Sequence, residues 1–291
     1  MLFEKKGPDS FVKNHISLTL FDWLCIGCLS LTIFLITYFV ILVNPLPSQA
    51  FAEHNSARFS EPKPEETRVI LLGDSRMRYA TYSESEISSI LEKRLNRPVN
   101  VLRIVNNWAV FDDFSPLIRD MIEFSPDLVV LQKELYTKAR SPYAVKVFAR
   151  KYWLWKIFGN GLWDPGSLDQ NALQNEMSCS VLNKRETVEG RKKRAYKWFN
   201  FSASGRSQES LKHLFKQAND KDIPYVFLSI PITSHAKAGL PSADTKAMPP
   251  VIAPNFIIDD QNFCDLVHMN PKGREQYSTW LVDTLVNLLN S

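Results

Sequence analysis

The chain has 291 residues, of which 45% are hydrophobic and 23% are charged, and its formal net charge is +4 at pH 7. With 10 Gly, 17 Pro and 4 Cys it belongs to neither the collagen-like, the low-complexity nor the disulfide-dense class. Because the apolar residues are concentrated in one run near the N-terminus, the composition excludes a multi-span membrane protein and predicts one globular domain preceded by a separate segment.

The first predicted element is an apolar run from Trp23 to Val43 that contains no charged side chain. At 1.5 Å rise per residue, its 21 positions cover a hydrocarbon core of ~30 Å. We therefore expect a transmembrane anchor within residues 18–44. Lysines precede this run, whereas no Lys or Arg follows it until Arg58, and this bias predicts a cytoplasmic tail of residues 1–17 and an extracytoplasmic main domain.

A cleaved signal peptide is the alternative interpretation of the same segment. Ala50-Phe51-Ala52 has the small-x-small pattern of a processing site. The apolar region of a signal peptide is ~7 to 15 residues long, however, and this run is longer. An uncleaved anchor is therefore favoured, and with either interpretation the main domain lies outside the cytoplasm, in the periplasm or the extracellular space.

The four cysteines fall into two pairs. Cys25 and Cys28 lie inside the apolar run, where they are interpreted as lipid-facing thiols. Cys179 and Cys264 could bridge in an oxidising compartment, although their spacing does not fix the geometry. No His, Cys, Asp and Glu group has metal-ligand spacing and no Gly-rich phosphate loop is present, so neither a metal nor a cofactor is expected.

Beyond the anchor, residues 45–66 are rich in Glu, Pro, Ser and Asn and are expected to form a linker. From residue 67 onward, apolar runs typical of buried strands alternate with helical patterns that have recognisable N-terminal signals. The strands are predicted at residues 68–72, 99–105, 127–131 and 223–230, and the helices at the capping box Ser83-x-x-Glu86, at Ser115-Pro116, around Leu211 and at Asn270-Pro271. This alternation predicts an α/β domain over residues 67–291, with a mostly parallel sheet covered on both faces.

An insertion at about residues 135–206 interrupts the alternation, because its aromatic and basic residues follow no clear period. Its densest basic stretch is residues 191–198, which contains Tyr196 and Trp198 as well as five basic side chains. Such a stretch could attract anionic lipid headgroups or an acidic polymer, or could form a solvated face. Nucleic acid is not expected as a partner of a domain outside the membrane.

Two short segments could together perform nucleophilic catalysis. Gly73-Asp74-Ser75 follows the first strand, at the edge where parallel sheets bind ligands. A serine hydroxyl needs a base to take its proton, and His268 can supply one while Asp265 accepts from the other ring nitrogen and fixes the tautomer. Each residue alone is explained more simply as a cap or a packing residue, and His235 is a competing base. Together they predict a Ser-His-Asp set.

Three segments resemble blocks of the SGNH (GDSL) hydrolase superfamily. Residues 71–75 are similar to its first block, 125–131 to its middle strand and 265–273 to its last block. The resemblance covers roughly residues 68–289 apart from the insertion. It implies a flavodoxin-like three-layer α/β/α sandwich in which Ser75 is the nucleophile, with His268 as its base and Asp265 orienting the base.

Two blocks depart from the family's pattern. The stretch that matches the second block begins Val105-Asn106-Asn107 and lacks the oxyanion-hole glycine, and the middle strand leads into Gln132-Lys133-Glu134 in place of Gly-x-Asn-Asp. The backbone N–H of Ser75 remains as an oxyanion donor. The side-chain amides of Asn106 and Asn107 are further candidates, and Asp74 completes the predicted oxyanion and substrate-binding residues.

An SGNH domain on a single N-terminal anchor is similar to the accessory proteins of membrane-bound O-acyltransferases, as in alginate acetylation and teichoic-acid D-alanylation. The resemblance implies an extracytoplasmic O-acyltransferase that uses an acyl-serine intermediate, with acetyl as the expected acyl group. Its acceptor would be a cell-surface or exported polysaccharide, and its partner a membrane-bound O-acyltransferase. A carbohydrate or lipid esterase and a non-catalytic interaction module of such a complex are the alternatives.

Overall fold

The computed structural model describes residues 19–43, 47–59, 63, 65–147, 187–201, 206–239 and 250–291. The chain divides into two units, Met1–Asn44 and Pro45–Ser291. The second unit contains the sheet and every residue that the sequence singles out for catalysis.

The first unit contains the helix α1 (Leu20–Val43). At its start, the backbone N–H and the hydroxyl of Thr19 both donate to the Asp22 carboxylate, each at 2.7 Å. Apolar side chains such as Phe21 and Trp23 are exposed along the helix. Among the described residues, no helix is both long enough and apolar enough to span a bilayer. The transmembrane anchor therefore stays a prediction.

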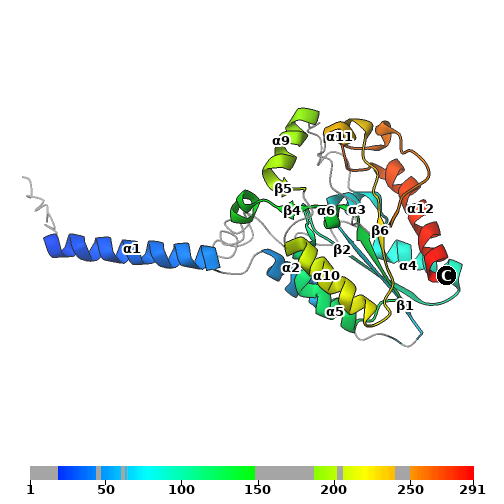
Figure 1. The fold of residues 1–291 in the computed structure, drawn as a ribbon, viewed down its shortest axis with the longest axis horizontal. Coiled ribbons are helices and arrows are strands. Elements are labelled where there is room, and N and C mark those ends of the chain that lie inside the picture. The colour runs from blue at the N-terminus through cyan, green and yellow to red at the C-terminus, as the bar shows by residue number, and fades with distance from the viewer. Residues whose placement is uncertain are drawn as a thin grey trace, which may run out of the picture. The chain divides into compact units, whose positions relative to one another are not determined.

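The second unit is built on a parallel sheet whose strand order is β2-β1-β3-β6-β7 (Figure 1). Its strands are β1 (Thr67–Gly73), β2 (Val99–Val105), β3 (Leu128–Gln132), β6 (Tyr225–Leu228) and β7 (Val251–Ile252). This is the flavodoxin-like order, in which the chain first adds β2 on one side of β1 and then β3 on the other. The carboxyl ends of β1 and β3 therefore border the topological switch point, where sheets of this kind bind ligands.

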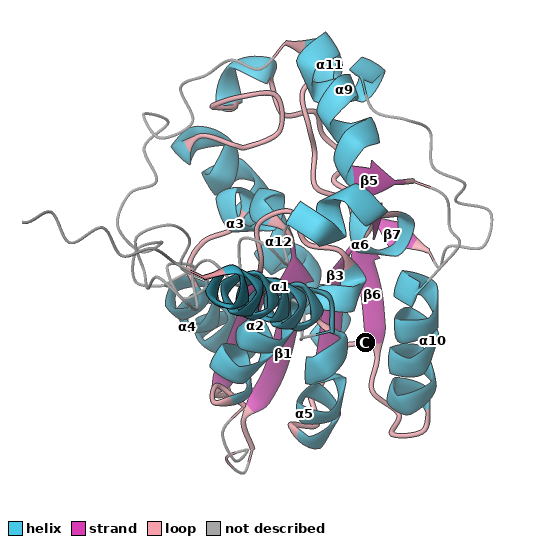
Figure 2. Ribbon diagram, turned by 90° about the vertical axis from the view of Figure 1, so that its left-hand side faces the viewer, coloured by secondary structure: helices cyan, strands magenta, loops and turns pink. Residues whose placement is uncertain are grey.

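Helices cover both faces of the sheet, and Figure 2 shows α4 and α10 on opposite sides of the strands. Successive residues of β1 point to opposite faces, so Ile70 and Leu72 belong to one apolar core and Val69 and Leu71 to the other. The first core is completed by α2 (Pro47–Ser56), α5 (Ile118–Glu123) and α10 (Arg206–Asn219), and the second by α3 (Ser75–Ala80), α4 (Glu84–Leu95) and α12 (Pro271–Leu289). The predicted three-layer α/β/α sandwich is confirmed.

The helices begin where their capping residues place them. At α4, Ser83 accepts from the backbone N–H of Glu86 while the Glu86 carboxylate accepts from the backbone N–H of Ser83, which is the predicted capping box. At α12, the Asn270 side chain accepts from the backbone N–H groups of Lys272 and Gly273. These bonds satisfy donors that a helix start leaves without intrahelical partners.

Residues 45–66 are predicted from the sequence to form a linker, but their first half includes the helix α2. Phe51 on this helix is 4% exposed, and its ring packs edge-on against that of Phe114 with 5.6 Å between centroids. The polar composition concealed the helix: among the residues of α2 whose burial is described, the buried apolar ones are Phe51 and Ala52.

The predicted insertion is described at both of its ends. After β3 come α6 (Glu134–Thr137) and β4 (Ala139–Arg140), and β4 pairs antiparallel with β5 (Phe199–Asn200), which follows α9 (Val188–Trp198). Figure 1 shows α9 next to α11 (Ser234–Gly239). Residues 148–186 lie outside the described residues, and so does Cys179. Cys264 is disulfide-bonded.

Candidate active site

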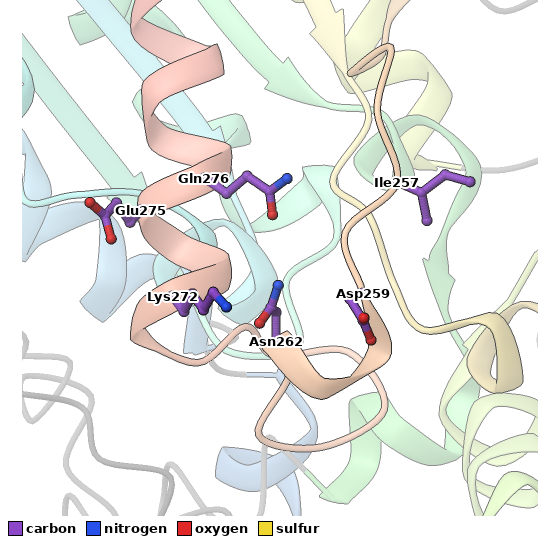
Figure 3. A pocket seen from close by; sticks show the side chains of 6 residues that line it. All are labelled: Ile257, Asp259, Asn262, Lys272, Glu275 and Gln276. Carbon is purple, nitrogen blue, oxygen red and sulfur yellow. The ribbon is translucent and has the colours of Figure 1, made fainter.

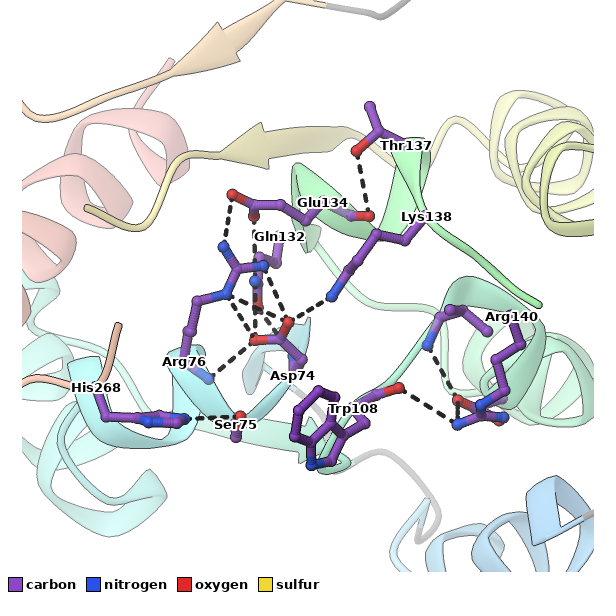
Figure 4. A network of polar contacts seen from close by, with 12 residues as sticks. Asp74, Ser75, Arg76, Trp108, Gln132, Glu134, Thr137, Lys138, Arg140 and His268 are labelled. Carbon is purple, nitrogen blue, oxygen red and sulfur yellow. Dashed lines mark hydrogen bonds and ion pairs between the residues drawn. The ribbon is translucent and has the colours of Figure 1, made fainter. Parts of the chain in front are cut away.

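Three predicted side chains converge at the carboxyl end of β1. Ser75 is the first residue of α3, and Asp265 and His268 lie on the segment that leads into α12. The Ser75 Oγ is 2.9 Å from the His268 Nε2, and the His268 Nδ1 is 2.7 Å from the Asp265 Oδ2. Figure 4 shows the imidazole directed at the serine hydroxyl. His235, the competing base, lies exposed on α11 and takes no part in this arrangement.

Asp265 is held by the backbone that follows it. Its Oδ1 accepts from the backbone N–H groups of Val267 and His268, both at 2.8 Å, so Oδ2 remains for the imidazole. Burial by itself would raise the pKa of Asp265, but the hydrogen bonds from the His268 ring and from the two N–H groups keep it below its ordinary value. A charged carboxylate at Nδ1 favours the tautomer in which Nε2 carries the lone pair that faces Ser75.

The imidazole of His268 is packed but accessible. Its side chain is 15% exposed, and the ring of Tyr79 lies against it with 4.6 Å between centroids. Tyr79 belongs to α3, the same short helix that carries Ser75, so one element positions the Ser75 hydroxyl and contacts one face of the imidazole. No sequence pattern indicates this contact, because Tyr79 lies about 190 positions from His268 along the chain.

The sharp passage from β1 into α3 depends on Gly73. A Cβ at this position would lie 2.5 Å from the Met77 Cβ and 2.9 Å from the Gln132 Oε1. Since the Met77 Cβ is fixed to the helix backbone, only glycine lets α3 begin so close to the strand. The N–H of Ser75 is then the first of the helix, and helix geometry leaves it without an intrahelical acceptor.

Asp74 lies at the centre of a buried cluster of charges beside Ser75 (Figure 4). Its carboxylate receives the Nζ of Lys138 at 2.7 Å and the Nη2 of Arg76 at 3.0 Å, and Arg76 also pairs with Glu134 at 2.9 Å. Burial of Asp74 opposes ionisation, but the two cations hold its pKa well below the ordinary value. Burial lowers the pKa of Lys138, against the attraction of Asp74. The carboxylates of Asp74 and Glu134 and the cations of Arg76 and Lys138 therefore neutralise one another beside Ser75.

The residues predicted to bind substrate or oxyanion have different positions. Asp74 is 5% exposed and occupied by its ion pairs, so it supports α3 instead of facing substrate. Asn106 and Asn107 lie on the loop after β2, half-buried and exposed respectively, and the N–H of Asn106 donates to the Gly73 carbonyl at 3.2 Å. The Gln132 side chain does not donate to an oxyanion, because its Nε2 already donates to Asp74 at 3.0 Å and to Glu134 at 3.1 Å.

An aromatic and cationic surface adjoins the site. Trp108 has a positive φ of 60°, and its ring stacks on that of Phe199 with 5.9 Å between centroids. The Arg194 guanidinium lies 5.4 Å from the Trp108 ring centre, and the Lys138 Nζ lies 5.0 Å from that of Phe199. Figure 4 shows Ser75 between His268 and Trp108. The two ends of the insertion thus approach the edge of the sheet that carries Ser75.

No group of three or more His, Cys, Asp and Glu side chains within the described ranges could hold a metal ion.

No protein-family model matches the chain, and no curated protein matches it. Among solved structures, the chain is similar to a lipase from a goat rumen metagenome, with 11% identity and a TM-score of 0.34 over 74% of this chain and 95% of that one. It is also similar to a lipase/acylhydrolase from Enterococcus faecalis, with 13% identity and a TM-score of 0.31 over 76% and 96% of the two chains.

Proposed function

We propose that this protein is an esterase-type serine enzyme in which Ser75 is the nucleophile, His268 its general base and Asp265 the residue that orients the base. The observation that carries the proposal is the continuous contact from the Ser75 Oγ through both ring nitrogens of His268 to the Asp265 carboxylate, at 2.9 and 2.7 Å. These distances lie within the hydrogen-bond reach that a nucleophile and its base require.

The arrangement supports acyl chemistry in two halves. In the first, Nε2 takes the Ser75 proton as Oγ attacks the ester carbonyl, and His268 then gives that proton to the departing alcohol oxygen, leaving an acyl-serine. In the second, Nε2 deprotonates water or an acceptor hydroxyl, which attacks the acyl carbon, and the proton returns to the Ser75 Oγ. The Asp265 carboxylate stabilises the imidazolium in both halves.

The oxyanion that develops on the carbonyl needs donors near Ser75. We propose the backbone N–H of Ser75 as the first, since it is the free N–H at the start of α3. The side-chain amide of Asn106 is the candidate second donor, because the backbone N–H of Asn106 binds the Gly73 carbonyl and so holds this residue at the end of β1. Loss of one such donor typically lowers kcat ~10²- to 10³-fold. Asn106→Ala is therefore expected to reduce kcat by about that factor if its amide contacts the oxyanion.

The test is hydrolysis of p-nitrophenyl acetate by the full chain in detergent. Ser75→Ala is expected to abolish turnover, whereas the control Ser291→Ala, which alters an exposed serine at the C-terminus, should retain it. Mass spectrometry of the wild type after rapid quenching should show an acetyl group on Ser75. Equal turnover by the two variants would refute the assignment of the nucleophile.

We further propose that a polysaccharide hydroxyl is the natural acceptor, so that the enzyme transfers an acetyl group outside the cytoplasm. Support comes from the half-buried Trp108 and the exposed Arg194 beside the site, because sugar rings stack on aromatic faces and acidic glycans pair with guanidinium groups. A membrane anchor and a membrane-bound O-acyltransferase partner belong to this proposal, since activated acyl groups are made in the cytoplasm. Trp108→Ala should lower transfer to an added glycan more than it lowers hydrolysis, and equal losses would count against the acceptor role.

A further inference from the structure

A pocket of about 480 Å³ lies beside the catalytic helix, bounded by the α3–α4 connection and by the first turns of α4 and α12. Its charged lining consists of three arginines and two glutamates: Arg78, Arg103, Arg274, Glu86 and Glu275. None of the three predicted catalytic residues lines it. Three guanidinium groups therefore border one partly enclosed space.

Arg78 is buried without a full set of partners. It is 5% exposed, and its Nη2 donates to the Val105 carbonyl at 3.2 Å. Its Nε is buried and has no hydrogen-bond partner among the described residues. Burial lowers the pKa of this guanidinium, against the influence of Tyr79. Buried donors in folded proteins are almost always paired, so the unpaired Nε leaves the Arg78 guanidinium, at the wall of the pocket, without a full set of acceptors.

Arg103 adds a second buried guanidinium from β2. It is 5% exposed, and its Nη1 donates to the carbonyls of Thr81 and Tyr82 at 3.0 and 2.6 Å. Burial lowers the pKa of Arg103 to about 10, and the nearby charges of Arg78 and Arg274 act in the same direction while Glu84 opposes them. Arg78 and Arg274 are therefore each close enough to Arg103 to repel it.

Arg274 is the most open of the three. It is half-buried on the first turn of α12, and within the described part of the chain its side chain makes no hydrogen bond or ion pair. Glu86 makes no direct ion pair with it, because the Glu86 carboxylate is bound to the hydroxyl and the backbone N–H of Ser83. The Ser83 hydrogen bonds and, more weakly, the charges of Arg274 and Arg103 lower the pKa of this carboxylate. Glu275 is exposed to solvent.

A neighbouring hollow of about 420 Å³ provides a contrast. It lies between residues 257–262 and the start of α12, and Figure 3 shows Lys272, Asp259 and Glu275 around it. Its cation is exposed and is outnumbered by carboxylates, and no buried donor is left unpaired there among the described residues. This hollow therefore gives no indication of an anionic ligand.

We propose that the pocket lined by Arg78, Arg103 and Arg274 binds a phosphate group. Guanidinium groups bind oxyanions through paired N–H donors, and three of them suit the three acceptor oxygens of a phosphate better than the two of a carboxylate. The site is also connected to the proposed catalytic edge. Arg78 is one turn from Ser75 on α3, and its Nη2 binds the carbonyl directly before Asn106.

The first experiment measures thermal unfolding of the full chain against inorganic phosphate, with sodium chloride at matched ionic strength as the reference. A ligand that binds only the folded state raises the unfolding temperature, and the rise grows with the logarithm of its concentration relative to its Kd. Phosphate should therefore stabilise the wild type and chloride should not. Arg274→Gln should weaken phosphate binding roughly tenfold or more, the effect of losing a charged hydrogen-bonding group.

The matched control is Arg119→Gln, which removes the same charge from an arginine that is 83% exposed on α5. This variant should respond to phosphate like the wild type. Arg78→Gln should lose the response as Arg274→Gln does, and if it does not fold, Arg274→Gln alone decides. A wild type that phosphate stabilises no more than chloride, or equal responses of the Arg119 and Arg274 variants, would overturn the proposal.

A second arm identifies the source of the phosphate group by comparing inorganic phosphate with glycerol 3-phosphate in the same assay. Tighter binding of glycerol 3-phosphate would support a phosphate-bearing substrate or lipid headgroup, and tighter binding of inorganic phosphate would support a free ion. Failure of both ligands to bind refutes the site. Because the readout is folded-state binding, this outcome is independent of whether the Ser75 chemistry is correct.

Discussion

Replacing Asp265 by Asn tests the proposed role of the Asp265 carboxylate while keeping a side chain of nearly the same shape. In the wild type, Oδ1 of Asp265 accepts from two backbone N–H groups and Oδ2 faces the His268 Nδ1 at 2.7 Å. The asparagine oxygen can keep the backbone bonds, and its NH₂ group then faces Nδ1. An amide donor at Nδ1 favours the tautomer with the proton on Nε2, which cannot accept the Ser75 proton.

The expected loss follows from this change of tautomer. The same substitution at the corresponding position of a Ser-His-Asp triad lowers kcat by about 10⁴, or about 5.5 kcal/mol of transition-state stabilisation. Stability should change little, because the two backbone bonds at 2.8 Å that fix the turn are retained. Catalysis and folding are therefore predicted to separate in this variant.

The assay is kcat/KM for p-nitrophenyl acetate, measured together with the thermal unfolding midpoint. Asp220→Asn is the matched control, because it makes the same chemical change at an exposed residue after α10 and should leave both quantities unchanged. Activity of the Asp265 variant within about tenfold of the wild type would refute the proposed role of the carboxylate. A large fall in the midpoint would show that Asp265 acts mainly on the fold.

Three further predictions concern the support beneath Ser75. Gly73→Ala should cost about 1–3 kcal/mol or more by overpacking against the Met77 Cβ at 2.5 Å, and should lower activity by shifting α3, as measured by urea unfolding and ester turnover. Asp74→Asn should cost about 3–5 kcal/mol, because Arg76 and Lys138 lose their buried counter-charge. The stability difference between this variant and the wild type should also depend on pH. Because folding lowers the pKa of Asp74 below 3.8, the difference should be constant above about pH 5 and shrink as acid protonates the carboxylate.

Controls distinguish these effects from general instability. Asp74→Glu keeps the charge in a longer side chain, so it should retain part of the ion-pair stabilisation that Asp74→Asn loses. An unfolding free energy of Asp74→Asn equal to that of the wild type at pH 7 would show that the buried cluster contributes no net stability. A Gly73→Ala protein with normal stability and turnover would show that the start of α3 can move away without consequence.

The regular part of the fold was predictable from local sequence. The β2 strand matches its expected range, and the α4 and α12 helices begin at the capping residues Ser83 and Asn270. These signals are visible because caps and buried strands depend on residues that are adjacent in the chain. The strand β7 was missed because it has only two residues, too few for a period to be recognised.

The catalytic candidates were predicted as a set, but their environment was not. Ser75, Asp265 and His268 stand in recognisable short motifs, and the structure brings them together. The sequence pattern predicts Asp74 as an oxyanion or substrate-binding residue, and nothing in the motif indicates that Lys138, 64 positions away, neutralises it. A buried ion pair depends on which elements meet in space, and the sequence pattern around either residue does not encode that meeting.

The sequence alone determined the alternation of strands and helices, and with it the parallel sheet and the edge at which chemistry was to be sought. Only the tertiary structure decided which side chains meet at that edge: the Tyr79 ring against His268, the cations around Asp74 and the arginines beside α3. The physical reason is one of range. Hydrophobic period and capping act over a few residues, whereas contacts between charges and rings are set by the packing of segments that are distant in the chain.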